Sequence, residues 1–220
     1  MEITLRCNAK CQSCSRHCPY GFYDEASDVT IEQVGRFIEE VKCHGNIDMV
    51  SIMGGEPTVH PQFREITELL RDELLRTHAI RRLQVVSNGI IPIDGALGVG
   101  VDLSAPEKAA RHRCQLVAPF DTGQKLKECP VPYDCGVSFG AYGWWPCGAG
   151  GAICRLFNLS QYRRDAIPRD ADDFPDRQIM HSLCQAKAEK YMMVADYGDI
   201  KSRSFRKAIR EFEVERLERY

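Results

Sequence analysis

The feature that most constrains this chain is a run of three cysteines near its N-terminus, Cys7, Cys11 and Cys14, spaced C-x3-C-x2-C. Three thiolates at this spacing can wrap one short loop around an iron–sulfur cube. A [4Fe–4S] cluster has one more iron than this run has cysteines, so one iron is left without a protein ligand. A small molecule can coordinate that open iron and receive an electron from it.

Two other metal sites compete with this interpretation, because Cys18 extends the run to C-x3-C-x2-C-x3-C, followed by Pro19. Structural zinc sites usually take their cysteines as two separated pairs, which this run does not provide. The bacterial ferredoxin run, C-x2-C-x2-C-x3-C-P, is one residue shorter in its first gap. The spacing therefore favours a three-cysteine cluster loop, with zinc and ferredoxin sites as alternatives.

Composition limits the class of protein. A chain of 220 residues with 44% hydrophobic residues can bury a proper core. A formal net charge of −2 gives no reason to expect a nucleic-acid or membrane surface, and the sequence has neither a membrane-spanning apolar run nor a signal peptide. We therefore expect a cytoplasmic protein. Without a secretory signal, its eleven cysteines favour metal or cluster binding over disulfides.

Hydrophobic periodicity predicts an α/β fold. Short apolar segments predict strands, over residues 2–6, 47–53, 83–87, 98–104 and 114–118. Thr30 and Gln33 form a capping-box pattern for a helix to about residue 43, and a second helix is expected to start near Pro61, a residue type favoured at the first helical position. Strands that alternate with helices in this way predict a parallel sheet with right-handed crossovers.

The connection after the third strand is unusually short. About ten residues separate Asn88 from the strand that begins at residue 98, and a helical crossover needs a dozen or more. We therefore expect a truncated, partial parallel β/α barrel that ends near residue 120. An open barrel edge of this kind suits a bulky substrate or a covering C-terminal segment.

Two more motifs follow predicted strands. Gly54-Gly55-Glu56-Pro57 comes directly after the second strand, and Ser87-Asn88-Gly89 after the third. Together with the cysteine loop after the first strand, they should meet at the carboxyl ends of the strands, where parallel α/β folds bind ligands. The glycines allow close backbone approach, Glu56 offers an anion to a ligand ammonium, and Asn88 offers an amide.

This ordered set of motifs resembles the radical S-adenosylmethionine (radical SAM) enzymes. The resemblance implies that Cys7, Cys11 and Cys14 hold a [4Fe–4S] cluster whose open iron binds S-adenosylmethionine. It also implies cofactor contacts from the GGEP and SNG motifs: the amino group of the methionine moiety meets Gly54, Gly55 and Glu56, and the ribose and methionine lie near Ser87 and Asn88.

Two further positions are compared with the family. Ser104 resembles the polar residue of the fourth strand, which meets the carboxylate of S-adenosylmethionine; a helix N-cap is the alternative. The family often has an aromatic residue before its third cysteine, packed near the adenine, and here Ser13 stands at that position. This chain therefore departs from the family pattern at its adenine contact.

The resemblance also implies a reaction and its partners. The reduced cluster, supplied by an electron donor such as flavodoxin or ferredoxin, would cleave S-adenosylmethionine to a 5′-deoxyadenosyl radical, which abstracts a substrate hydrogen. We expect a small metabolite or a nucleotide-derived molecule as substrate. Maturation of a ribosomally made peptide is an alternative, although no separate leader-peptide recognition domain fits. A non-catalytic iron–sulfur or zinc protein is the alternative of another class.

A second group of cysteines lies in the C-terminal half. The segment from Cys135 to Cys147 resembles the auxiliary-cluster modules of radical SAM enzymes, SPASM and its shorter twitch form. The expected ligands of a second [4Fe–4S] cluster are Cys129, Cys135, Cys147 and Cys184, with Cys154 as a competitor and zinc as the alternative metal. We therefore divide the chain into a barrel core (1–120), a cysteine-rich extension (121–190) and a C-terminal helix (191–220).

The remaining features are expected to be structural. Trp144 and Trp145 should pack in the core, and Gly148-Ala149-Gly150-Gly151 should form a turn. Residues 202–220 have an amphipathic stripe that should dock on its own domain, with a homodimer contact as the alternative. Cys18 and Cys43 are interpreted as spare thiols. His17 and His44 are interpreted as surface residues.

Overall fold

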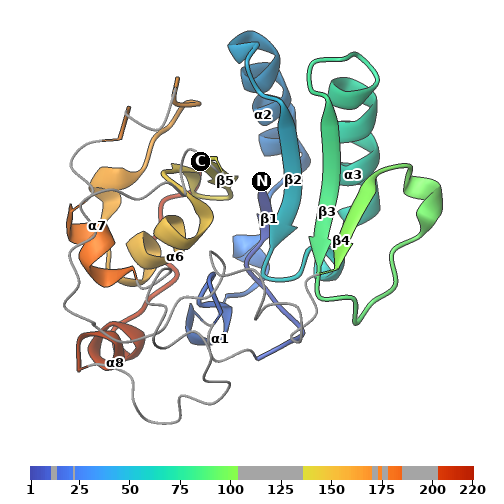
Figure 1. Ribbon diagram of the computed structural model, residues 1–220. Helices are drawn as coiled ribbons and strands as arrows, with labels where there is room; N and C mark the ends of the chain where they lie inside the picture. Colours follow the sequence, from blue (N-terminus) through green and yellow to red (C-terminus); the bar gives the residue numbers. More distant parts are fainter. Residues whose placement is uncertain (11–13, 22, 104–135, 170–172, 175–177, 185–202) are drawn as a thin grey trace.

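The computed structural model describes residues 1–10, 14–21, 23–103, 136–169, 173–174, 178–184 and 203–220. These residues form a six-stranded sheet in the order β4-β3-β2-β1-β5-β6 (Figure 1). Its strands are Glu2–Thr4 (β1), Met49–Gly54 (β2), Arg82–Ser87 (β3), Gly100–Leu103 (β4), Ser138–Gly140 (β5) and Gly143–Trp145 (β6). The pairs from β4 to β5 are parallel, and β6 is antiparallel to β5. The predicted α/β class is therefore confirmed.

The first strand lies at the centre of the sheet. Glu2 is in register with Met53 of β2 on one side and with Gly140 of β5 on the other. The cysteine-rich C-terminal half thus contributes two strands to the same sheet as the N-terminal half, which the sequence did not predict. The three-segment division of the chain stays a prediction.

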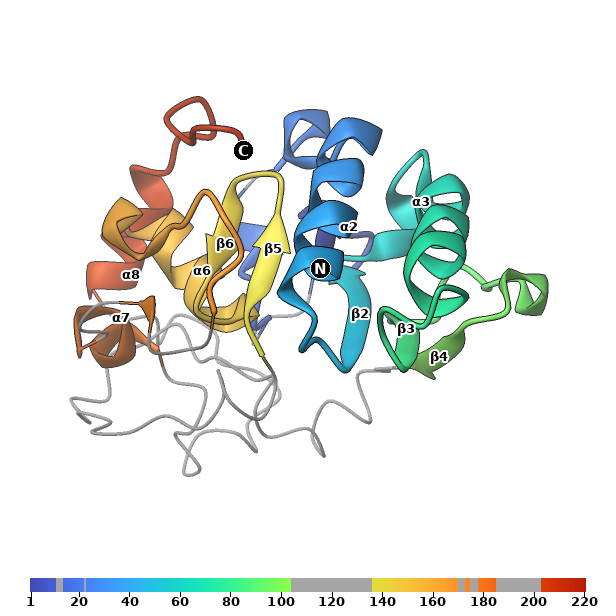
Figure 2. The same ribbon diagram turned by 90° about the horizontal axis from the view of Figure 1, so that it is seen from above.

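Two helices cover one face of the parallel strands. They are α2 (Ile31–His44) and α3 (Phe63–Leu70), which continues as a π-helical turn, η3 (Arg71–Leu75). Figure 2 shows them side by side on that face. The capping box of Thr30 and Gln33 is confirmed by both of its hydrogen bonds, and Gly45 ends α2 in the left-handed conformation with φ 73°.

The second helix begins near Pro61, as predicted, but Pro61 itself is not its first residue. A 3-10 turn, η2 (Pro57–Val59), follows β2, and Pro61 lies in the turn between it and Phe63. The ring Nδ1 of His60 accepts the main-chain N–H of Gln62 at 3.0 Å, which holds this turn outside the helix. The preference of proline for a first helical position is therefore overridden by a side-chain contact.

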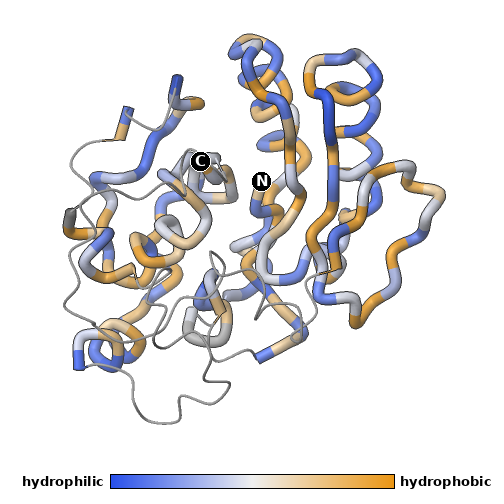
Figure 3. The backbone as a smooth tube through the Cα atoms, viewed as in Figure 1, coloured by the Kyte–Doolittle hydropathy of each residue, from blue (hydrophilic) through white to orange (hydrophobic). Residues whose placement is uncertain are grey.

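The core lies between the sheet and these helices. Alternate strand residues point toward the helices and are fully buried, among them Ile3, Ile52 and Val85. Helix residues with helical spacing complete the layer, including Phe37, Ile66 and Leu70. Figure 3 shows apolar and polar residues alternating along α2 and α3, as amphipathic helices require.

The short connection between β3 and β4 is confirmed. It contains only a 3-10 turn, η4 (Gly95–Leu97), and β4 still pairs parallel to β3 with Val85 opposite Val101. The predicted strand 114–118 lies outside the described residues. Within the described residues, β4 is one of the two edge strands of the sheet.

The C-terminal half adds α6 (Gly148–Leu156), η6 (Ser160–Tyr162), α7 (Gln178–Leu183) and α8 (Arg203–Arg210). The turn predicted at residues 148–151 is wrong, because these residues form the first turn of α6. A side chain at Gly150 would lie 2.7 Å from the sulfur of Met180, and one at Gly151 would lie 3.0 Å from the ring of Trp145. Close packing against α7 and β6 therefore favours small residues here, and tertiary contacts override the low helix propensity of glycine.

The C-terminal segment docks on its own chain, as predicted, but its helix is shorter than predicted. Phe205 is fully buried, and the rest of the apolar stripe packs against the core: Ala208, Ile209, Phe212 and Leu217. After α8 the chain returns to the β5–β6 hairpin, where Tyr220 donates its N–H to the carbonyl of Ala141 at 2.9 Å. Docking is thus achieved by apolar packing of the stripe together with main-chain contacts beyond the helix.

Two other structural predictions have clear outcomes. Trp144 and Trp145 are each 3% exposed, so their core role is confirmed. His17 is wrong as a surface residue, because it is 2% exposed and packs its ring against Phe205. Within the described residues, no helix is long and apolar enough to cross a membrane.

Candidate functional site

The cysteine loop leaves the sheet at the carboxyl end of β1. Figure 1 shows the arrowheads of β2 and β3 pointing to the side of the molecule where α1 (Cys18–Gly21) lies. Cys7 and Cys14 are both partly exposed at this rim. Cys11 and Ser13 lie outside the described residues, as does Ser104. The rim therefore presents two of the three predicted cluster cysteines in the described structure.

The glycines of the GGEP motif bring two chain segments into close contact. The N–H of Gly55 donates to the carbonyl of Thr4, and the N–H of Glu56 donates to the carbonyl of Arg6, both at 2.9 Å. A β-carbon at Gly54 would lie 2.1 Å from the Thr4 oxygen, and one at Gly55 would lie 2.2 Å from the Arg6 oxygen. The glycines are required because the residues preceding Cys7 lie directly against them.

Glu56 is a buried carboxylate that joins the second and third motifs. Its side chain is 1% exposed, and its Oε1 accepts the N–H of Thr58 at 3.1 Å and the hydroxyl of Ser87 at 2.9 Å. Its Oε2 accepts the N–H of Asn88 at 2.7 Å. The carboxylate therefore fixes the turn after β3, a role that the sequence did not predict.

Asn88 closes the connection to the cysteine loop. Its side-chain amide donates to Oδ1 of Asn8, the residue after Cys7, at 2.8 Å. Its own Oδ1 accepts the N–H of Ile90 at 3.0 Å, which fixes the orientation of the amide. Direct hydrogen bonds thus link the cysteine loop, the GGEP motif and the SNG motif.

A buried polar network anchors the strand that precedes the loop. Thr4 donates its hydroxyl to Asp28 at 2.5 Å, and Arg6 forms an ion pair with the same carboxylate. His60 donates from Nε2 to the carbonyl of Val29 at 3.0 Å, and burial lowers its pKa, so the ring is neutral. Sequence reasoning missed these residues, because no spacing pattern pairs Arg6 with a carboxylate in a distant loop.

The electrostatics of the loop favour a thiolate at Cys14. The pKa of Cys14 is lowered to about 6, chiefly because the Cys18 thiol donates a hydrogen bond to its sulfur, and the N–H groups of Cys18 and Arg16 also contribute. The same contact raises the pKa of Cys18. A metal ligand must be deprotonated, so Cys14 is prepared for that role. Cys18 is therefore more than a spare thiol: it holds the sulfur of Cys14.

Buried charges lie beneath the loop. Glu2 of β1 forms an ion pair with Arg16 at 2.6 Å and with Arg155 of α6 at 3.3 Å, and Glu2 and Arg155 are each 1% exposed. Burial, and secondarily Arg155 and Arg16, lower the pKa of His17 to about 3. Charge pairing at Glu2 thus connects the cysteine loop with α6 across the central strand.

The second cysteine group is partly assembled. Cys147 caps the N-terminus of α6, accepting the N–H of Gly150 at its sulfur at 3.2 Å, and Cys154 follows two turns later on the same helix. Burial raises the pKa of Cys154, and the nearby sulfurs of Cys147 and Cys184 raise it further. Three buried thiols therefore lie near one another. Cys129 and Cys135 lie outside the described residues. Among the residues that the structure describes, no three histidine, cysteine, aspartate or glutamate side chains are arranged to hold a metal ion.

A cavity of about 200 Å³ is lined by β2, β5, helix α2 and the start of α6, and also by Arg16, which lies just beyond Cys14 in the sequence. Its walls are mostly apolar and include Met49, Phe37 and Trp144. None of the rim motifs lines it. The candidate site is therefore the rim itself, defined by contacts between motifs and not by this cavity.

Comparison with known proteins agrees with this arrangement. Residues 1–102 match the family model described as the Radical SAM superfamily. An S-adenosylmethionine-dependent nucleotide dehydratase of Selenomonas ruminantium is 29% identical over 122 residues, which cover 56% of this chain and 35% of that protein. A tungsten-containing aldehyde ferredoxin oxidoreductase cofactor-modifying protein of Pyrococcus furiosus is 31% identical over 108 residues, covering 47% of this chain and 28% of that protein.

A GTP 3′,8-cyclase 3 of Mycobacterium bovis is 21% identical over 96 residues, which cover 44% of this chain and 25% of that protein. The dehydratase and the cyclase are enzymes by name. In each comparison the match covers about a third or less of the relative's own length. The part of this chain that matches the Radical SAM superfamily model, residues 1–102, contains β1 to β3, most of β4 and the motifs at the rim.

Proposed function

We propose that this chain is a radical SAM enzyme that binds a [4Fe–4S] cluster through Cys7, Cys11 and Cys14 and reductively cleaves S-adenosylmethionine at the open iron. The observation that carries the proposal is the chain of direct contacts at the rim. Glu56 bonds Asn88, and Asn88 bonds Asn8 in the cysteine loop. Residues from three separate loops are therefore held as one unit where a cofactor would bind.

The chemistry of the donor set fits a cluster. Cys7 and Cys14 are accessible at the rim, and the lowered pKa of Cys14 supplies a thiolate at neutral pH. When bound, the cluster supplies the electron that breaks the S–C5′ bond and releases a 5′-deoxyadenosyl radical. The protein's part is to hold the loop, orient the ligand and exclude water.

Glu56 has a different part from the one expected. Both of its oxygens already accept hydrogen bonds from the protein, two from Thr58 and one each from Ser87 and Asn88. Three of these donors face Oε1 and only the N–H of Asn88 faces Oε2, so Oε2 keeps a lone pair for one more donor. In this proposal Glu56 first positions the SNG turn and then offers that remaining place to the ammonium of S-adenosylmethionine.

We also propose a nucleotide-derived small molecule as substrate. The names of two relatives support this class, because one is a nucleotide dehydratase and another a GTP cyclase. A flavodoxin or ferredoxin would supply the electron.

The C-terminal cysteines would hold a second [4Fe–4S] cluster of the SPASM or twitch type. The proximity of Cys147, Cys154 and Cys184, all buried, supports this part of the proposal. Cys129 and Cys135 remain the other proposed ligands. A buried thiol with a raised pKa binds metal only on deprotonation, so loading this site should release protons.

The test is iron and sulfide per chain after anaerobic reconstitution. The wild type should hold about eight irons, and a Cys7/Cys11/Cys14→Ala triple variant about four. Cys43→Ala, at an exposed thiol on α2, is the matched control and should lose none. Dithionite and S-adenosylmethionine should give 5′-deoxyadenosine with the wild type only. If the triple variant keeps all of its iron, or the wild type makes no 5′-deoxyadenosine, the proposal fails.

The same assay assigns the second site. Cys147→Ala should lower the iron content from about eight to about four per chain. Cys154→Ala and Cys184→Ala are then compared, and the cysteine whose loss has the same effect is the ligand. If the wild type holds about four irons and also zinc, the C-terminal cysteines form a structural zinc site and not an auxiliary cluster. That result would leave the first cluster untouched.

A further inference from the structure

A second cavity, of about 250 Å³, has a partly polar lining that includes none of the rim motifs. It is lined by residues of the β5–β6 hairpin, the end of α6 and the C-terminal segment, including Tyr142, Trp145, Arg155, Arg163 and Arg216. Its floor is buried, because Tyr142 and Trp145 are each 3% exposed and Arg155 is 1% exposed. Its mouth is formed by exposed residues, among them Asn158 and Ser160.

Several buried donors of this cavity lack an acceptor among the described residues. The hydroxyl of Tyr142, the indole Nε1 of Trp145 and the Nε atoms of Arg163 and Arg216 are each buried without a hydrogen-bond partner in the described part of the chain. Burial raises the pKa of Tyr142, so its hydroxyl keeps its proton at neutral pH. Buried donors without acceptors are costly in a folded protein. A set of them around one space indicates an acceptor that fills it.

The charges of the lining point the same way. Arg155 is paired with Glu2. Arg216 donates to the main-chain carbonyls of Arg155, Leu156 and Glu211, and its guanidinium lies over the ring of Phe212, so none of these partners among the described residues is a carboxylate. Arg163 pairs with Asp165 and Glu218, whose side chains are 78% and 86% exposed and therefore weak partners. The cavity thus has positive charge in excess at its wall.

We propose that this cavity binds an oxyanion, a phosphate or the phosphate group of a monoester, held by the arginines at its wall and by the hydroxyl of Tyr142 and the indole N–H of Trp145 at its floor. The space is several times that of one water molecule, about 30 Å³, and so accommodates such a group. Arginine is suited to oxyanions because its planar fork donates in parallel. Glu218, the carboxylate at the mouth, is exposed and can turn away when an anion enters.

The site is separate from the rim and from the proposed radical chemistry. Its link to the rest of the protein is Arg155, which contacts Glu2 on the central strand. Cys154 also lines the cavity, so a metal cluster on that thiol is the competing occupant. The other competing occupant of the cavity is ordered water.

The experiment is calorimetric titration of the whole chain with inorganic phosphate and with ribose 5-phosphate, in buffers of equal ionic strength set with chloride. The fluorescence of Trp145 gives an independent readout, because its indole lines the cavity. We expect saturable binding with a tryptophan signal. Tighter binding of ribose 5-phosphate would assign the ester, and binding of inorganic phosphate alone would assign the free anion; either result supports the site.

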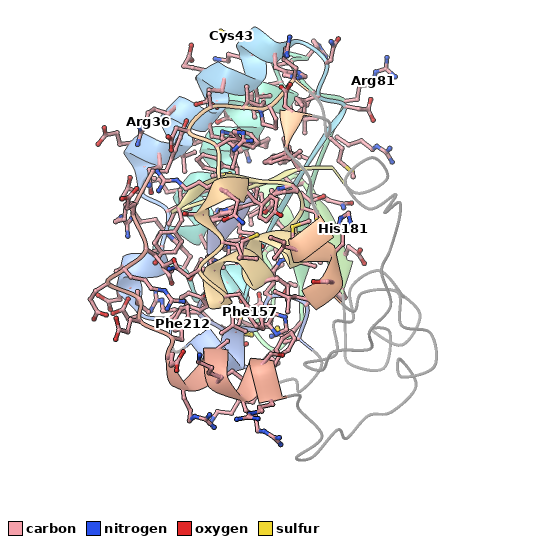
Figure 4. All side chains as sticks on the ribbon, turned by 90° about the vertical axis from the view of Figure 1, so that its left-hand side faces the viewer. Arg36, Cys43, Arg81, Phe157, His181 and Phe212 are labelled. Carbon is pink, nitrogen blue, oxygen red and sulfur yellow. The ribbon has the colours of Figure 1, made fainter. Side chains whose placement is uncertain are left out.

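Two conservative variants test the residues. Arg163→Gln should weaken binding about tenfold or more, and Tyr142→Phe several-fold, since each removes a donor to a charged ligand. Tyr142→Phe removes a hydroxyl that has no protein partner among the described residues, so it should fold normally by circular dichroism. The matched control is Arg81→Gln, because the side chain of Arg81 is 87% exposed. Figure 4 shows Arg81 far from Phe157 and Phe212, the two labelled residues that lie near the cavity.

Three outcomes would overturn the proposal. The first is that neither ligand gives a saturable signal with the wild type, which would mean that the cavity holds only water. The second is that binding is the same in Arg163→Gln and Tyr142→Phe as in Arg81→Gln, which places the anion elsewhere. The third is that phosphate binding disappears whenever iron is loaded, which assigns the space to a cluster on Cys154.

Discussion

The carboxylate of Glu56 accepts the main-chain N–H of Asn88 at 2.7 Å, so a side chain that follows β2 fixes the turn that follows β3. The other oxygen of Glu56 accepts the main-chain N–H of Thr58 at 3.1 Å. The two main-chain donors thus face two different oxygens of one buried group. This arrangement requires a carboxylate, because an amide has a single acceptor oxygen.

We therefore predict that Glu56→Gln destabilises the protein by about 1–3 kcal/mol, because one main-chain N–H loses its acceptor in a buried place. Urea unfolding at pH 7 measures the change. Glu65→Gln, an exposed position on α3, is the matched control and should change the free energy of unfolding by less than about 0.5 kcal/mol. Equal stability of Glu56→Gln and wild type would show that the carboxylate does not hold the turn.

Gly55→Ala should disrupt the cysteine loop. Its new β-carbon would lie 2.2 Å from the carbonyl oxygen of Arg6, so the chain preceding Cys7 must move. We expect a loss of at least about 2 kcal/mol in the free energy of unfolding, together with reduced iron incorporation after reconstitution.

The control for that variant is Gly35→Ala, in the middle of α2. A β-carbon there meets no atom within 4 Å. Alanine is the better helix former, so this change should stabilise the protein by about 0.5–1 kcal/mol and leave the iron content unchanged. If both variants behave alike, close packing at Gly55 is not what shapes the loop.

The rim of the site was predictable from the sequence, because parallel topology alone brings loops after successive strands to one edge. The motifs at Cys7, Gly55 and Asn88 each follow an apolar strand segment, and the parallel order of these strands places the three motifs at the same edge of the sheet. The partnership of Asp28 with Arg6 was not predictable, since it depends on how a loop without periodicity folds back on β1. The burial of His17 was not predictable either, because its ring packs against Phe205, far along the chain.

The C-terminal half was less predictable for a different reason. Pairing of β5 with β1 joins residues more than a hundred positions apart, and strands as short as Ser138–Gly140 carry almost no periodic signal. Gly148 to Gly151 has the composition of a turn, yet packing against Trp145 and Met180 makes it a helix. Local propensity fails where tertiary contacts select small residues.

The thiol pair at the cysteine loop gives a chemical prediction. In the reduced, cluster-free protein, the rate of Cys14 alkylation should follow an apparent pKa of about 6, because Cys18 donates to its sulfur. Cys18→Ala should raise that apparent pKa, and Cys43→Ala should not move it. Iodoacetamide labelling across pH, read by peptide mass spectrometry, measures it. An unchanged profile in Cys18→Ala would remove Cys18 from the role assigned to it.

The buried His17 predicts how stability depends on pH. Its folded-state pKa, about 3, lies below the value of about 6.5 in the unfolded chain, so the unfolded state binds more protons in between. The stabilisation is therefore complete above about pH 6.5 and is lost as the pH falls toward 3. Between pH 7 and pH 5 this histidine alone should lower the free energy of unfolding by about 2 kcal/mol.

The measurement is urea unfolding of His17→Asn at the two pH values, beside wild type. Asparagine tolerates the positive φ of 51° at this position and cannot titrate, so the variant should have a shallower pH dependence whatever its absolute stability. His78→Asn is the matched control, since His78 also has a positive φ, 62°, but is exposed. A slope in His17→Asn as steep as that of His78→Asn would mean that other groups carry the acid sensitivity, and that His17 is not held neutral in the folded protein.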